Sequence, residues 1–119
     1  MITPDIIRDL EERYPGKKII TLPAEDPKEV ICEVDVTPEK SVAIAVIDKS
    51  APHFHRIMTE TYRMVKGVLL VTMDGEQHLF LEGETCVITP GIIHHAEGNA
   101  AEIEVTCVPA WTPEDHILV

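Results

Sequence analysis

The chain has 119 residues, of which 45% are apolar and 4% aromatic, and its formal net charge at pH 7 is −11. This length suits one compact domain whose core is built mainly from Val, Ile and Leu, residues that favour strands. So acidic a chain repels phosphate backbones, which argues against a nucleic-acid partner, and no run of about eighteen apolar residues is present to cross a membrane.

The three cysteines, Cys32, Cys86 and Cys107, are an odd number without close pairing. This pattern favours reduced, buried thiols over a disulfide framework. The N-terminus also lacks the basic and apolar regions of a signal peptide. We therefore expect a cytoplasmic protein.

A short helix is predicted at the N-terminus. Thr3 is a typical N-cap residue, and Pro4 suits the first helical position. The apolar face continues through about Arg13, and Pro15-Gly16 ends the helix.

From residue 18 onward the pattern changes to short strands separated by turns. Asp74-Gly75 and Gly98-Asn99 are hairpin signals, and Thr112-Pro113 resembles a helix start in the tail. Residues 30–36 alternate, with one mostly polar face, whereas residues 41–47 are apolar on both faces, as in a strand buried on both sides. The predicted strands are 18–22, 30–36, 41–47, 60–65, 68–73, 77–81, 86–88, 94–97 and 103–107. Many short strands are typical of a sandwich or small barrel.

The segment His53-x-His55 is the first half of a candidate metal site. On a strand both imidazoles face the same side, roughly 6.5–7 Å apart along the chain. Glu60 follows at an odd spacing, so it can join them only if the chain bends between Arg56 and Thr59. Two imidazoles and a carboxylate are a ligand set that iron, manganese, nickel and zinc sites use.

A second histidine segment supplies the candidate fourth ligand. Pro90-Gly91 bends the chain just before two adjacent histidines, His94 and His95. Neighbours on a strand point opposite ways, so both cannot bind one ion from one regular strand. We prefer His94, because Gly83 and Gly91 fix the turn geometry that aims it, and keep His95 as the alternative.

These two segments resemble the two motifs of the cupin superfamily. The first motif is Gly, five residues, His-x-His, three or four residues, Glu, six residues, Gly. The chain matches it with His53, His55, Glu60 and Gly67, and has Ile47 in place of the leading Gly.

The second cupin motif is Gly, five residues, Pro-x-Gly, two residues, His, three residues, Asn. The chain matches it with Gly83, Gly91 and His94, and departs from it at Thr89 and Gly98. A register one residue later keeps the Pro and the Asn but loses both glycines; its residues are Pro90, Ile92, His95 and Asn99.

The resemblance covers about residues 42–108. It implies an all-β fold, a double-stranded β-helix or jelly-roll barrel, here with a short N-terminal helix. The expected division is one domain, 1–119, with an N-terminal helix and arm (1–29), a β-barrel (30–108) and a C-terminal tail (109–119). The cupin resemblance also implies a bound divalent transition metal (Fe, Mn, Ni or Zn) and a homodimer. The implied ligands are His53, His55, Glu60 and His94.

The resemblance implies a metal-dependent enzyme that acts on a small molecule, with dioxygenase or sugar-isomerase chemistry; the alternative is a non-catalytic module that binds or senses a ligand. Glu60 and Tyr62 are the candidate catalytic residues. Tyr62 is two positions after Glu60 on the same predicted strand, so both side chains should point inward. There Tyr62 either donates a hydrogen bond or a proton to the substrate or is an ordinary core tyrosine. Arg56 could bind an anionic substrate or form a surface salt bridge, and His116 is expected to be exposed.

Overall fold

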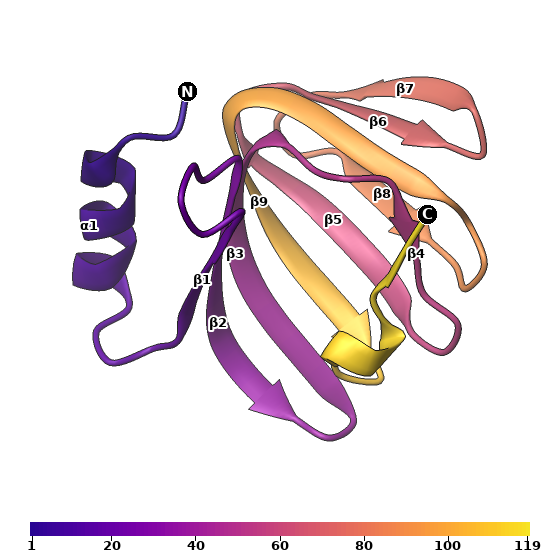
Figure 1. Cartoon of the computed structure of the whole chain (residues 1–119), viewed down its shortest axis with the longest axis horizontal. Helices are drawn as coiled ribbons and strands as arrows, with labels where there is room; N and C mark the ends of the chain where they lie inside the picture. Colours follow the sequence, from indigo (N-terminus) through magenta and orange to yellow (C-terminus); the bar gives the residue numbers. More distant parts are fainter.

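A computed structural model describes residues 1–119, the whole chain. The elements are one helix, α1 (Pro4–Arg13), a 3-10 turn, η1 (Pro113–Asp115), and the strands β1 (Ile19–Leu22), β2 (Glu29–Thr37), β3 (Lys40–Lys49), β4 (His53–Phe54), β5 (Thr59–Lys66), β6 (Leu69–Met73), β7 (Glu76–Phe80), β8 (Thr85–Ile88), β9 (His94–Val108) and β10 (Ile117–Leu118). The strands form one sheet that curls round an interior (Figure 1). The predicted all-β barrel with a short N-terminal helix is confirmed.

Strand β9 connects the two halves of the sheet. It pairs with β3 and β4 on one side and with β5 and β6 on the other, always antiparallel. Strands β1 and β2 extend the sheet beyond β3, and β10 pairs with β4, so the C-terminal residues also join it. None of the helical segments is long and apolar enough to cross a lipid bilayer.

Helix α1 lies outside the barrel, over β2 and β3 (Figure 1). Its only fully buried residue, Leu10, packs in a small cluster with Val30, Cys32, Ile44 and Val46. The opposite face of β3 belongs to the main core inside the barrel. This second apolar layer explains why residues 41–47 are apolar on both faces, as the sequence predicted.

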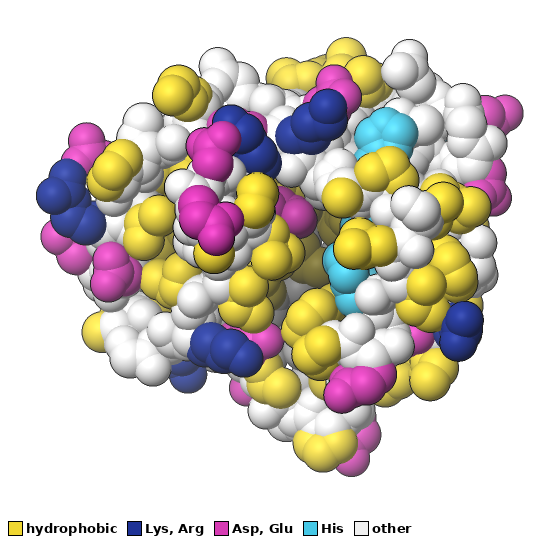
Figure 2. Space-filling view, in the orientation of Figure 1, with side chains coloured by type: hydrophobic (Ala, Val, Ile, Leu, Met, Phe, Trp, Pro, Cys, Tyr) yellow, Lys and Arg dark blue, Asp and Glu magenta, His cyan; other side chains and the backbone are white.

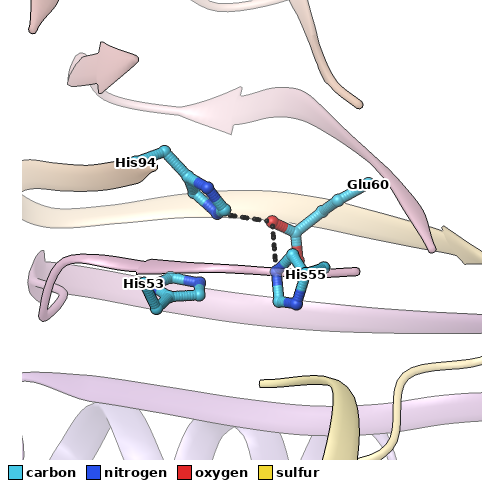
Figure 3. A group of neighbouring side chains, drawn as sticks. All are labelled: His53, His55, Glu60 and His94. Atoms are coloured by element: carbon cyan, nitrogen blue, oxygen red, sulfur yellow. Dashed lines mark hydrogen bonds and ion pairs between the residues drawn. The ribbon is translucent and has the colours of Figure 1, made fainter. Parts of the chain in front are cut away.

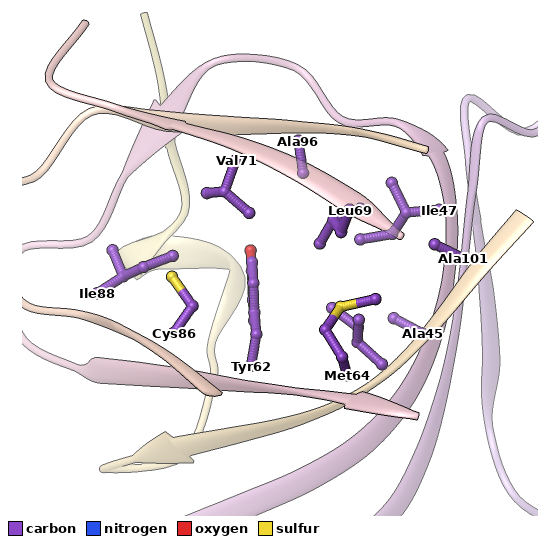
Figure 4. Close-up of a cluster of buried hydrophobic side chains, with 11 residues drawn as sticks. Ala45, Ile47, Tyr62, Met64, Leu69, Val71, Cys86, Ile88, Ala96 and Ala101 are labelled. Atoms are coloured by element: carbon purple, nitrogen blue, oxygen red, sulfur yellow. The ribbon is translucent and has the colours of Figure 1, made fainter. Parts of the chain in front are cut away.

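The main core fills the part of the barrel bounded by β3, β5, β6, β8 and β9 (Figure 4). Its buried residues are Ala45, Ile47, Tyr62, Met64, Leu69, Val71, Cys86, Ile88, Ala96, Ala101 and Ile103. All three cysteines are buried and unpaired with one another, as predicted.

The predicted hairpin at Gly98-Asn99 is wrong, because residues 94–108 form one continuous strand. The chain bulges there instead: Ile47 of β3 pairs with Ala101, whereas Lys49 pairs with Glu97. Gly98 is needed for close approach, since a Cβ at this position would lie 2.9 Å from the Cβ of Ala101. A glycine inside a strand therefore marked a bulge here rather than a turn.

Candidate metal centre

The structure brings together the four side chains that the sequence singled out (Figure 3). His53 lies on β4 directly opposite His94, the first residue of β9, and His55 follows β4. Glu60 extends from β5. All four are buried, and one ligand atom from each lies within 4.8 Å of all the others. This spacing is suited to a single ion bound between them.

Each of the three imidazoles is held by a hydrogen bond from its Nδ1 atom to a backbone carbonyl. The partners of His53, His55 and His94 are, in that order, the carbonyl oxygens of Ala51, Asp115 and Ile92, at 2.7, 2.7 and 2.9 Å. A carbonyl oxygen only accepts, so Nδ1 carries the hydrogen in all three rings. In the neutral rings Nε2 therefore has a free lone pair, which is the form that binds a metal ion.

The Glu60 carboxylate lies between these nitrogens. Its Oε1 is 3.2 Å from Nε2 of His94 and 3.6 Å from Nε2 of His55, and Nε2 of His55 is buried without a hydrogen-bond partner. Lone pairs that face each other at such distances need a proton or a cation between them. The thiol of Cys107 donates to Oε2 at 3.8 Å. The donor set therefore fits a divalent transition ion.

The pKa values in the cluster follow from burial and from the charge of Glu60. Burial raises the pKa of Glu60, but the imidazoles of His55 and His94 beside it favour its charged form and hold this pKa far below its ordinary value. Burial lowers the pKa of His55, but the nearby carboxylate of Glu60 and the carbonyl of Asp115 raise it more, so this pKa lies above its ordinary value. Burial and the neighbouring His94 lower the pKa of His53 to about 4, so this ring is neutral at pH 7.

Asp115, which sequence reasoning missed, fixes the bend that brings Glu60 to the histidines. Its carboxylate accepts hydrogen bonds from the backbone N–H groups of Arg56, Ile57 and Met58, at 2.7 to 3.3 Å. These hydrogen bonds also outweigh the effect of burial and lower the pKa of Asp115. The bend predicted between Arg56 and Thr59 is therefore held by a residue from the far end of the chain. The odd spacing between His55 and Glu60 was the only sequence signal for this bend, and nothing in the sequence pointed to Asp115.

A cavity of about 710 Å³ adjoins the cluster, and both His53 and Glu60 line it. Its walls are largely apolar and come from β1, β2, β3 and β9, with Trp111 from the C-terminal tail. Figure 2 shows a hollow on this face of the molecule with histidine side chains at its edge. A cavity of this size can hold a small organic molecule next to the cluster.

The remaining candidates divide between the cavity and the surface. Tyr62 is buried, as its parity predicted, and lines the cavity. Burial and the charge of Glu60 raise its pKa well above the ordinary value. The structure places His94 in the cluster, whereas His95 lies on the other face of β9, and Arg56 is exposed outside the cavity.

The prediction that His116 is solvent-exposed is wrong. This residue is half-buried, lines the cavity and stacks on His53, with ring centroids 4.2 Å apart. The reason is the pairing of β10 with β4, which folds the C-terminal residues back over the cluster. No local sequence pattern signalled this pairing between two-residue strands.

Comparison with known proteins identifies the fold but gives no close relative. No family model matches the sequence, and no curated protein matches it. Among solved structures, Pac13 from Streptomyces, described as a nucleoside dehydratase and solved with uridine, is similar with a TM-score of 0.79 and 16% identity, over 89% of this chain and 87% of that one.

Two further structures are similar along most of their length. A RmlC-like cupin from Shewanella frigidimarina has a TM-score of 0.69 and 18% identity, over 84% of this chain and 88% of that one. KdgF from Halomonas has a TM-score of 0.68 and 18% identity, over 77% of this chain and 87% of that one. Identities this low establish the architecture alone. With its curled antiparallel sheet and these structural relatives, the chain has the cupin fold.

Proposed function

We propose that this chain is a metal-dependent enzyme that acts on a small molecule in its barrel. The ligands are His53, His55, Glu60 and His94. The proposal rests on one observation: three imidazoles, each fixed by a backbone carbonyl, converge on one buried carboxylate at the wall of a cavity. When bound, a divalent ion supplies Lewis acidity to an oxygen atom of a small molecule.

The chain's own residues have distinct parts in this proposal. The largely apolar cavity holds and orients the substrate next to the cluster. Tyr62 keeps its hydroxyl proton at neutral pH, because its pKa is raised, and so serves as a hydrogen-bond donor to the substrate. Glu60 is a ligand and the negative charge of the site. A nucleoside dehydratase is among the similar structures, so nucleosides as well as sugars are candidate substrates in the test.

The test separates metal binding from turnover. The protein is stripped with chelator and titrated with Fe²⁺, Mn²⁺, Ni²⁺ and Zn²⁺ by calorimetry; we expect about one ion per chain. The loaded protein is then incubated with sugars and nucleosides, with NMR for isomerised or dehydrated product and an electrode for dioxygen uptake. Product formation that Tyr62→Phe slows, without loss of metal, supports the proposal. Dioxygen uptake would instead indicate oxygenase chemistry. Tight binding of a small molecule without turnover would indicate a non-catalytic module.

The homodimer implied by the cupin resemblance remains a prediction. Leu70 and Leu79 form a cross-strand pair on β6 and β7, and Leu79 is 59% exposed. Sedimentation equilibrium at micromolar concentration measures the mass directly. A mass twice that of one chain is expected, and a single-chain mass at all concentrations would contradict the dimer.

A further inference from the structure

The inner wall of the cavity carries a carboxylate that the metal cluster does not use. Along β2 the residues that alternate with the helix-facing ones point into the cavity, and they are Glu29, Ile31 and Glu33. Val30 and Cys32 face helix α1 instead. The polar face of this strand therefore lies on the inside of the barrel. Carboxylates usually lie on the protein surface, so an acidic side chain in a largely apolar cavity wall is a candidate for a binding role.

Glu29 is fixed in position by its backbone. It pairs with Leu22 on β1 and with Ile47 on β3. The carbonyl of Lys28, just before it, accepts hydrogen bonds from the N–H groups of Asp48 and Lys49 at 2.8 and 3.1 Å. From Lys49 the chain reaches His53 within one short connection. Glu29 is therefore held rigidly beside the segment that carries the first histidine.

The Glu29 side chain makes no hydrogen bond or ion pair within the chain, whereas the ammonium group of neighbouring Lys28 lies 3.3 Å from Asp26. Burial and, as a smaller effect, the charge of Glu60 together raise the pKa of Glu29 to about 7. The two carboxyl groups thus share one poorly solvated space. At neutral pH the Glu29 carboxyl is a strong hydrogen-bonding group without a partner, in a cavity that can hold a small molecule.

We propose that Glu29 contacts the substrate, accepting a hydrogen bond from a hydroxyl or ammonium group on the part of the molecule that is not bound at the metal cluster. This inference rests on the proposed function, because it needs the substrate to occupy the cavity beside the cluster. It also sets the substrate class: a molecule with a compact apolar body, metal-chelating oxygens and a separate hydrogen-bond donor. Glu29, Glu33 and Glu60 together disfavour an anionic end group.

The experiment uses the full chain loaded with Zn²⁺, which has no redox chemistry and so leaves catechols intact. The probes are four catechols that differ only in the group para to one hydroxyl: methyl, hydroxymethyl, aminomethyl or carboxylate. The two catechol oxygens chelate the ion, and the variable group tests the part of the cavity wall that carries Glu29. Calorimetry gives the dissociation constant of each probe. The proteins are the native chain, Glu29→Ala, Glu29→Gln and, as a charge-matched control on the same face of β2, Glu33→Gln.

In the native chain we expect the hydroxymethyl or the aminomethyl probe to bind about tenfold tighter than the methyl probe, and the carboxylate probe to bind weakest. Glu29→Ala should reduce this ratio to about one and leave affinity for the methyl probe unchanged, whereas Glu33→Gln should retain most of the ratio. Glu29→Gln keeps an oxygen acceptor without the charge. If the polar probe still binds more tightly than the methyl probe to Glu29→Gln, the donor is a hydroxyl group, which needs only an acceptor. If the two probes bind equally, the donor is an ammonium group, which needs the negative charge.

Failure of this inference can be distinguished from failure of the proposed function. Binding of Zn²⁺ and of the methyl probe, with the same probe ratio in the native chain and in Glu29→Ala, would overturn the role of Glu29 alone. Tightest binding of the carboxylate probe would also overturn it. A chain that binds no Zn²⁺ would overturn both. Loss of the Glu29 carboxylate, which makes no hydrogen bond within the chain, should not unfold the protein, and a thermal melt of each variant verifies this.

Discussion

The backbone carbonyl of Asp115 accepts a hydrogen bond from Nδ1 of His55 at 2.7 Å, although 60 positions separate the two residues. The carboxylate of the same aspartate holds the N–H groups of Arg56, Ile57 and Met58. One residue of the tail thus fixes both the ring of a ligand and the bend that carries the chain to Glu60. Outer hydrogen bonds of this kind orient metal ligands and fix their tautomer.

Replacement of Asp115 by Ala should therefore weaken metal binding as well as the fold. We expect metal affinity to fall by roughly 10–100-fold, and the free energy of unfolding by roughly 1–3 kcal/mol, because buried N–H groups lose their acceptor. Metal titration and urea denaturation measure the two effects. Glu114→Ala, at an exposed neighbouring position, is the control and should change neither. Equal affinities in the two variants would show that the tail does not support the site.

The stability of the metal-free protein should depend on pH through Glu29. Its pKa is raised from 4.5 to about 7 in the fold, so the folded chain binds this proton more tightly than the unfolded chain. Stability therefore decreases as pH rises from 4.5 to about 7, and the full penalty is present above that window. Glu29→Gln removes the charge, so it should stabilise the protein by about 1–2 kcal/mol near pH 8, with allowance for solvent in the cavity, and by almost nothing near pH 4.

Urea denaturation at both pH values measures this effect. The control is Glu25→Gln, an exposed glutamate in the loop before β2. An equal effect of Glu29→Gln at both pH values would show that the carboxyl is not in a poorly solvated space. Lower stability of this variant near pH 8 would show that the carboxylate has a cationic partner.

The bulge in β9 should not tolerate a side chain at position 98. In Gly98→Ala the new Cβ would lie 2.9 Å from the Cβ of Ala101 and 3.1 Å from the carbonyl oxygen of Val68. The backbone must shift, so we expect a loss of about 1–3 kcal/mol in the free energy of unfolding. Ala100→Gly is the matched control. Ala100 has a φ of 50°, which glycine adopts without strain, and this gain offsets the higher entropy of the unfolded chain, so the free energy of unfolding should change little. Equal effects of the two substitutions would contradict the bulge geometry.

The four residues of the cluster could be picked out from the sequence because the spacing within each of its two segments is local. His53 and His55 alternate, and the odd step to Glu60 required a bend, which the structure contains between Arg56 and Met58. The turn at Gly91 likewise favoured His94 over His95, and the structure places His94 in the cluster. In each case residues within a few positions of one another determine the direction of the side chain.

The other half of the site could not be predicted because it depends on contacts between distant segments. Asp115 and His116 reach the cluster only through the pairing of β10 with β4, which no local pattern indicates. For β2 the alternation separated two faces, but only the position of helix α1 determined that Glu29 points inward. At Gly98 the hairpin prediction failed because a glycine that allows close backbone approach has the same local signature as one in a turn.

The most direct test of the metal centre compares two adjacent histidines. Chelator-stripped native protein, His94→Ala and His95→Ala are each titrated with Zn²⁺ by calorimetry, and bound metal is counted by mass spectrometry. We predict about one tightly bound ion per chain in the native protein and in His95→Ala. The affinity should be at least about 100-fold lower in His94→Ala, which lacks one of the buried imidazoles of the cluster. Equal affinities in both variants, or no tight binding by the native chain, would contradict this prediction.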